Sequence, residues 1–211
     1  MSSFAVLIGL AALVSAIVSY RVYRTTYGAL PAARWADVCL LALVFGVAGG
    51  RLAHVLLNQT YFADHLAEAL DPRYGGLHWS GALIGAFLGV VIAARWRKLP
   101  LLRVLDALAP ALPLIGLAAW TACIGGRCGY GAEIPTLAYT SPLIAAELPD
   151  VYGILAPRFQ TRLWGQLWSL GLLVLWGIVY WRQWLIGRRF WVILALMLVG
   201  LVFISGYQPI P

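Results

Sequence analysis

Long apolar stretches separated by short polar connections dominate the chain. Six of them are candidate membrane spans, at about residues 4–20, 37–57, 77–94, 101–123, 164–181 and 190–206. A helix needs about 20 apolar residues to cross a bilayer, and the six stretches come close to that length. The pattern therefore predicts an all-α fold, a polytopic helical membrane bundle of about six transmembrane helices in a single domain over residues 1–211.

Basic residues collect in alternate connections between these stretches. They are Arg21, Arg24 and Arg34 after the first stretch, Arg95, Arg97, Lys98 and Arg103 after the third, and Arg182, Arg188 and Arg189 after the fifth. Connections rich in Lys and Arg stay in the cytoplasm, so the N-terminus, residues 58–77, residues 126–162 and the C-terminus are predicted outside. Prolines interrupt the 126–162 segment, for which we expect a lid or an interfacial helix and no further span.

Composition narrows the class of protein. Hydrophobic residues make up 62% of the chain and charged residues 11%, where soluble domains carry about 25% charged residues. The net charge of +7 suits contact with anionic lipid, and nothing in the sequence indicates nucleic-acid binding. The first stretch lacks the flanks of a cleaved signal, so we expect a retained helix. The three cysteines predict neither a paired framework nor a metal site.

Arg51 is the most informative residue, because it interrupts an apolar stretch directly after Gly49 and Gly50. A central arginine costs roughly 2.5 to 3.5 kcal/mol on insertion scales, so such a residue is normally paired, faces a cavity or binds an anion. The two glycines let a ligand or another backbone approach closely. The alternative is an arginine that extends its side chain to the interface from near the helix end.

Other polar groups are predicted to converge with Arg51 in an outward-facing lipid cavity. His54 follows it on the same helical face. His78 precedes Ser80 and Gly81 where a helix is expected to start, and a helix N-terminus favours phosphate. A third group comes from the glycine-rich turn after the fourth stretch. It contains Gly126 and Arg127, and backbone N–H groups of such turns can form an anion-binding nest.

Each of these features also has a purely structural interpretation. A lone histidine at a membrane interface is more often a polar anchor than a catalyst. Glycine-rich turns commonly just close a helix hairpin. Asp106 either pairs with Arg103 near the cytoplasmic surface or takes a buried role.

Four motifs in sequence order resemble the prolipoprotein diacylglyceryl transferase family. They are Gly49-Gly50-Arg51-Leu52, the GLHWSGALIG stretch that ends at Gly85, the Asp106–Pro113 stretch, and the glycine-rich turn, with Gly165-Gln166-Leu167-Trp168 further on. The resemblance covers about residues 20–168. It implies an enzyme of the bacterial cytoplasmic membrane that moves the diacylglyceryl group of phosphatidylglycerol onto a lipoprotein-precursor cysteine and releases glycerol phosphate. It implies no cofactor.

Several positions depart from the family pattern. Ser80 stands where the family has a histidine, and His54 stands where an aromatic residue is usual. The family arginine at the outer end of the fourth span has Arg127 as its nearest basic counterpart, further along the chain. Residues 163–169 lack the family's His and Glu, and no arginine follows Phe190. The fold therefore carries over more securely than the chemistry.

Two functions remain open. As a divergent transferase, the chain would use His78, His54 and Arg127 in catalysis, with His78 or His54 as the base for the thiol proton. The phospholipid ligands would be Arg51, Gly50, Ser80, Gly81, Gly126 and Gln166. As a catalytically degenerate relative, it would be a lipid-binding subunit or an assembly factor of a larger membrane complex. A transporter is a distant third, because neither half of the chain repeats the other.

Overall fold

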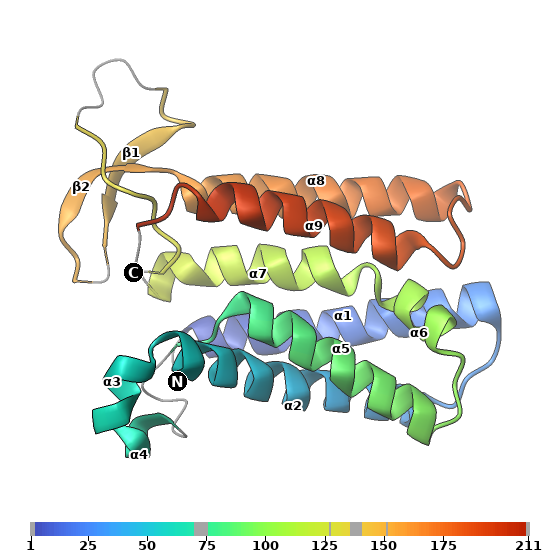
Figure 1. The fold of residues 1–211 in the computed structure, drawn as a ribbon. Coiled ribbons are helices and arrows are strands. Elements are labelled where there is room, and N and C mark those ends of the chain that lie inside the picture. The colour runs from blue at the N-terminus through green and yellow to red at the C-terminus, as the bar shows by residue number, and fades with distance from the viewer. Residues whose placement is uncertain (1–2, 70–75, 127, 136–140, 151, 210–211) are drawn as a thin grey trace. The chain divides into compact units, whose positions relative to one another are not determined.

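The computed structural model describes residues 3–69, 76–126, 128–135, 141–150 and 152–209. Helices dominate, with one short pair of strands (Figure 1). In chain order the elements are α1 (Ser3–Tyr27), α2 (Ala32–Leu57), α3 (Gln59–Asp64), α4 (Leu66–Ala69), α5 (Trp79–Trp96), α6 (Leu101–Leu108), α7 (Ala111–Gly126), β1 (Ala145–Pro149), β2 (Leu155–Phe159), α8 (Thr161–Trp181) and α9 (Arg189–Ser205).

The predicted fold class, an all-α helical membrane bundle, is confirmed. Among the described residues, five helices are long and apolar enough to cross a membrane, namely α1, α2, α5, the continuous stretch Leu101–Gly126 that contains α6 and α7, and α8. The sixth expected span corresponds to α9, an apolar helix of 17 residues that is shorter than the others. The chain forms two compact units, residues 20–105 and residues 1–19 with 106–211.

Glycines bring α2 and α5 into close contact within the first unit. A Cβ atom added at Gly49 would lie 2.4 Å from the carbonyl oxygen of Gly81, and one added at Gly85 would lie 2.1 Å from that of Phe45. Small residues at such positions let two backbones approach and gain van der Waals contact in a membrane. Arg97 pairs with Asp37 towards the opposite end of the two helices. The packing thereby fixes the register of α5 against α2.

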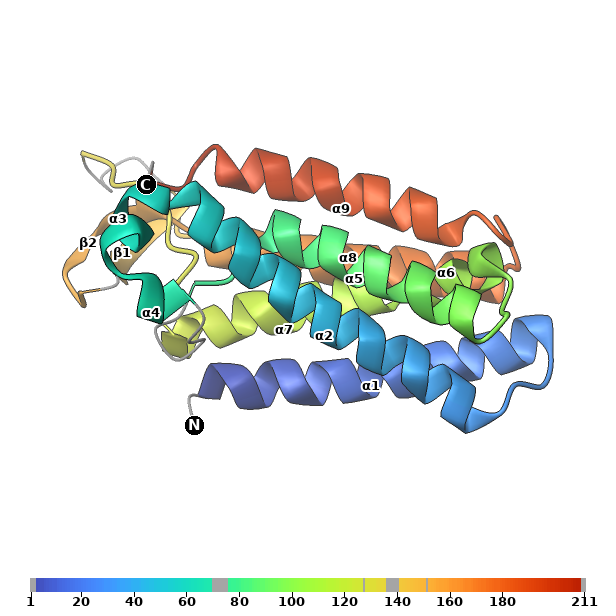
Figure 2. The same ribbon diagram turned by 60° about the horizontal axis from the view of Figure 1, so that its bottom comes forward.

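In the other unit, α7, α8 and α9 pack along one another and lie side by side in Figure 1. Figure 2 draws the same helices after a turn of 60° about the horizontal axis. Gly165 of α8 lies against the indole of Trp120 on α7, and Gly200 of α9 lies against the indole of Trp168. Asp106 takes the buried one of its two expected roles. The backbone N–H of Arg189 donates to its Oδ1 at 2.8 Å, so Asp106 caps the start of α9.

The segment between α7 and α8 holds strands where an interfacial helix was one expectation. β1 and β2 pair antiparallel, with Ala145 opposite Phe159 and Pro149 opposite Leu155. No helix occurs in the described parts of residues 128–160. That expectation was wrong because strand pairing satisfies the backbone here while it tolerates the prolines, which a helix interior does not.

The expectation that the cysteines form no pair was also wrong. Cys123 and Cys128 form a disulfide, whereas Cys39 in α2 is a free cysteine. The chain turns directly after α7, and the backbone N–H of Cys128 donates to the carbonyl oxygen of Cys123 at 3.2 Å. This turn brings together two side chains whose separation of five residues is no familiar signature.

Candidate functional site

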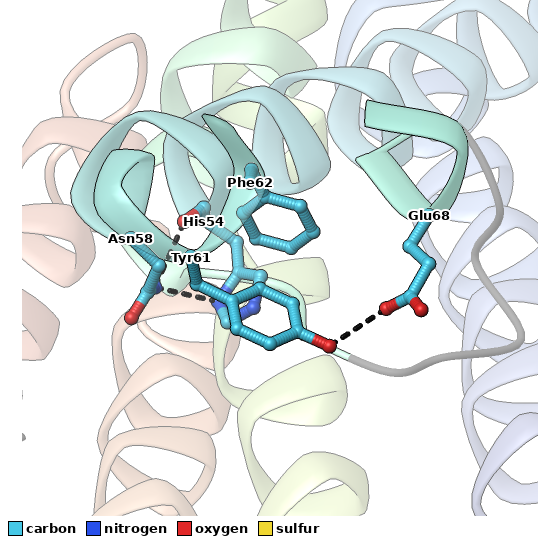
Figure 3. A pocket seen from close by; sticks show the side chains of 5 residues that line it. All are labelled: His54, Asn58, Tyr61, Phe62 and Glu68. Carbon is cyan, nitrogen blue, oxygen red and sulfur yellow. Dashed lines mark hydrogen bonds between the residues drawn. The ribbon is translucent and has the colours of Figure 1, made fainter. Parts of the chain in front are cut away.

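A hollow of about 350 Å³ lies at the C-terminal end of α2, where α3 and α4 fold back beside it (Figure 3). Its lining residues are His54, Asn58, Tyr61, Phe62 and Glu68. The chain leaves α2 at Asn58, whose side-chain amide donates to the carbonyl oxygen of His54 at 2.9 Å. Its own carbonyl then accepts from Tyr61 and Phe62, which starts α3 without an extended linker.

The hollow combines aromatic surface with hydrogen-bonding groups. The Tyr61 hydroxyl donates to Oε2 of Glu68 at 2.8 Å, a bond that is visible in Figure 3. The Asn58 side-chain nitrogen lies 3.4 Å from Nδ1 of His54, and the imidazole meets the Phe62 ring edge-on at 5.8 Å. A ligand in this hollow would therefore meet an imidazole, an amide, a phenol and a carboxylate around one aromatic ring.

Arg51 contacts two residues that line this hollow, Phe62 and Glu68, and is buried, with 9% of its surface exposed. Its Nε donates to the carbonyl oxygen of Ala69 at 2.9 Å, and its Nη1 donates to that of Gly76 at 3.2 Å. Its Nη2 donates to the carbonyl oxygen of Glu68, and its guanidinium carbon lies 5.3 Å from the centre of the Phe62 ring. Of the expected explanations for an intramembrane arginine, pairing is the one this geometry displays, with backbone carbonyls as partners.

Gly76 joins Arg51 and His54. Its φ of +78° lies in the left-handed region that favours glycine. A Cβ atom added there would lie 2.1 Å from Nε2 of His54, so the imidazole packs directly on the glycine backbone. A larger side chain at this position would displace the imidazole.

His78 and Ser80 stand at the start of α5. The His78 N–H donates to the carbonyl oxygen of Gly50 at 3.0 Å, and its Nδ1 lies 2.8 Å from the Ser80 hydroxyl oxygen. Gly50 and Gly81 are both buried in the contact between α2 and α5. A Cβ atom added at Gly81 would lie 2.3 Å from the carbonyl oxygen of Gly49. The nearest neighbours of Gly81 are the Gly49 backbone and the Ala53 side chain, and those of Gly50 are the side chains of Ala82 and Leu77. The contact of both glycines with lipid stays a prediction.

The structure brings six of the nine predicted site residues into the same unit. They are Gly50, Arg51, His54, His78, Ser80 and Gly81. Gln166 and Gly126 belong to the other unit, where the Gln166 amide donates to the Thr121 hydroxyl at 3.2 Å. Arg127 lies outside the described residues, so its convergence with Arg51 and His78 stays a prediction.

Sequence reasoning missed most of the lining. Asn58 could have been noticed, because it follows His54 by one helical turn and their side chains can meet. Tyr61 and Phe62 carry no such signal, since their contacts depend on how two short helices fold back. Glu68 carries no such signal either, because an acidic residue in a polar connection is common.

Besides Arg189, the arginines Arg158 and Arg162 are buried in the other unit. Arg162 donates from Nε to the carbonyl oxygen of Cys128 at 2.7 Å, which ties the start of α8 to the disulfide-closed turn. Nη2 of Arg158 on β2 lies 3.5 Å from carboxylate oxygens of both Asp150 and Glu133. Both arginines were overlooked because they lie in a connection and at a helix start, where exposed basic residues are common.

Comparison of the sequence with known proteins identifies one family. The model of the prolipoprotein diacylglyceryl transferase family matches residues 1–209. The phosphatidylglycerol–prolipoprotein diacylglyceryl transferase of Parasynechococcus marenigrum is 34% identical over 145 residues, which cover 66% of this chain and 50% of that protein. The enzyme of that name from Thermus thermophilus is 30% identical over 179 residues, covering 73% of this chain and 61% of that protein. This chain thus matches between one half and two thirds of the length of these relatives.

Proposed function

The chain belongs to the prolipoprotein diacylglyceryl transferase family, and on that basis we propose that it transfers diacylglycerol from phosphatidylglycerol to a cysteine thiol of a lipoprotein precursor. In this reaction the thiol sulfur attacks the diacylglyceryl carbon that carries the phosphate. A carbon–sulfur bond forms, the carbon–oxygen bond breaks, and glycerol phosphate leaves with the phosphodiester oxygen. The proposed location is the cytoplasmic membrane of a bacterium.

The observation that carries the proposal is the amphiphilic surroundings of the hollow. Its lining is polar and aromatic, whereas Leu52, Leu56 and Leu57 of the same helix end are exposed by 61%, 62% and 64%. Ligand pockets usually measure about 300 to 1,000 Å³, so a hollow of about 350 Å³ suits a headgroup and excludes a whole lipid. A phospholipid can place its head in the hollow and its acyl chains along the leucines.

Arg51 supplies charge for an anionic head. Its guanidinium carries a positive charge, and three of its nitrogen atoms donate to carbonyl oxygens. Charge interactions strengthen where water is scarce, so a phosphate near the hollow is attracted to this cation. Ser80 is a proposed headgroup ligand as well, and Gly50 and Gly81 contribute by letting α5 start beside Arg51. Gly126 and Gln166 complete the proposed lipid-binding set.

A base must take the proton of the attacking thiol. A cysteine thiol has an unperturbed pKa of about 8.5 and an imidazole one of about 6.5, which makes histidine the natural base at neutral pH. His54 lines the hollow directly, and His78 is hydrogen-bonded to Ser80 at the start of α5. We assign the base to one of these two histidines. Arg127 is proposed to stabilise the departing phosphate.

The second candidate function is a lipid-binding relative without catalysis, within or assisting a larger membrane complex. It is favoured by the occupation of the Arg51 donors by backbone carbonyls. It is also favoured by Ser80, which stands at the histidine position of the family pattern. In such a protein the hollow would still hold a headgroup.

Transfer measured with the purified protein separates the two functions. Vesicles that contain phosphatidylglycerol labelled in the acyl chains are mixed with a lipobox peptide, and labelled peptide is quantified. We expect a fall of about a hundredfold in His54→Ala or in His78→Ala, in line with the usual contribution of a general base. The matched control is His65→Ala, because His65 is exposed and does not line the hollow. If the parent protein binds phospholipid but transfers no label, the transferase proposal is refuted and the second function is supported.

A further inference from the structure

We infer that Arg51 is a positioning residue that assembles the headgroup hollow by holding α3, α4 and Gly76 against the end of α2. The inference rests on the proposed function only in assigning the hollow to a lipid headgroup. Arg51 is not among the lining residues, yet it contacts two of them, Phe62 through the ring and Glu68 through the backbone. Its side chain therefore affects the hollow through these two lining residues.

The carbonyl groups that Arg51 binds need a donor. Glu68 and Ala69 are the last two described residues of α4, and no residue between Leu66 and Ala69 can donate to their carbonyl oxygens, because an α-helical donor lies four residues further on. Basic side chains near a helix C-terminus commonly bind such carbonyls. Arg51 does so from a different helix, and it binds the Gly76 carbonyl on the far side of the connection. One side chain thus joins the end of α4 to the residues that lead into α5.

This arrangement requires an arginine. The three carbonyl oxygens are reached by three different nitrogen atoms, Nε, Nη1 and Nη2. A guanidinium presents five N–H groups in a rigid planar fork, whereas a lysine has a single nitrogen at the end of a flexible chain. The same plane packs on Phe62, which an ammonium group would cover less well. A lysine at this position should therefore keep the positive charge but only some of the contacts with the three carbonyl oxygens and Phe62.

The consequence for the proposed reaction is specific. His54 lies on α2, and the Asn58 amide nitrogen 3.4 Å from its Nδ1 does not depend on Arg51, so removal of the guanidinium leaves the imidazole on α2 and loosens only its packing on Gly76. The wall that includes Phe62 and Glu68 loses its anchor. We expect weaker headgroup binding with little change in the chemical step, which raises KM and leaves kcat nearly unchanged.

The test compares Arg51→Met, Arg51→Lys and Arg97→Met. Arg97 is the matched control, because it also lies at an end of the pair α2 and α5, where it pairs with Asp37. Amide hydrogen exchange of residues 59–69 is followed by mass spectrometry in detergent micelles, with α8 and α9 as internal references. We expect exchange of residues 59–69 to rise at least tenfold in Arg51→Met and by a smaller factor in Arg51→Lys. Arg97→Met should match the parent protein there.

Kinetics then complete the test. For Arg51→Met we expect KM for phosphatidylglycerol to rise about tenfold with kcat within a factor of about three. Unchanged exchange at residues 59–69 would overturn the inference whatever the kinetics, because Arg51 would then act on the phosphate by its charge alone. Faster exchange in a protein whose parent shows no transfer would support the inference while it refutes the proposed transferase. If Arg51→Met cannot be purified, Arg51→Lys decides, and parent-like exchange in that variant overturns the inference.

Discussion

Removal of the Asp106 carboxylate should strongly destabilise the unit formed by α7, α8 and α9. The side chains of Asp106 and Arg189 are both fully buried, with Nη1 of Arg189 3.9 Å from Oδ2 of Asp106. Asp106 also accepts the backbone N–H of Arg189. Removing one partner of a buried ion pair typically costs about 3 to 5 kcal/mol, because the other charge stays buried without compensation. We place Asp106→Ala near the lower value, about 3 kcal/mol, since 3.9 Å is too long for a hydrogen bond.

A double-mutant cycle gives the sharper measurement. Asp106→Leu and Arg189→Met are made singly and together, and unfolding in mixed micelles with rising dodecyl sulfate is followed by tryptophan fluorescence. The double variant should be more stable than either single variant, because apolar replacement of a whole buried ion pair is often neutral. It should stay about 1 to 3 kcal/mol below the parent, because the backbone N–H of Arg189 loses its acceptor. Arg103→Met is the control, since Arg103 lies over the Tyr27 ring and takes no part in the pair. A cost under about 1 kcal/mol for Asp106→Ala would refute the reasoning.

Three further outcomes are expected. Gly85→Ala should destabilise the protein by roughly 1 to 3 kcal/mol through overpacking against Phe45, whereas Gly171→Ala, with no neighbour within 4 Å, should be neutral or stabilising in the same unfolding assay. A reagent that cannot cross the membrane should label a tag at Glu147 but not one at Lys98 in intact cells whose outer envelope has been opened; the reverse pattern would disprove the charge-based topology. Alkylation of the unfolded protein should modify one cysteine without reductant and all three after reduction, and three without reductant would contradict the disulfide.

The membrane helices could be predicted because apolar length alone specifies them, and Arg51 stood out because its cost in such a stretch is high. The hollow could not be predicted. Its walls come from the end of α2 and from α3 and α4, which are helices of 6 and 4 residues. Such short helices have little intrinsic stability, so no local sequence pattern predicts them.

For the segment between α7 and α8, the sequence correctly excluded a further spanning helix but did not predict the two strands. Prolines such as Pro149 and Pro157 ruled out a further spanning helix. They did not reveal that the residues around them pair as strands, because pairing depends on distant partners. Asp106 shows the same limit, since its partner Arg189 lies 83 residues further along the chain.

The disulfide at the end of α7 has a consequence for the orientation of the chain in the membrane. Disulfides persist in oxidising compartments such as the periplasm and are rare in the reducing cytoplasm. The Cys123–Cys128 bond therefore predicts that the end of α7 faces the oxidising side, which is also the side that the distribution of basic residues predicts. A molecule inserted upside down would keep both thiols reduced. In each protein molecule, a disulfide between these two sulfur atoms therefore indicates the predicted orientation, and two free thiols indicate the opposite one.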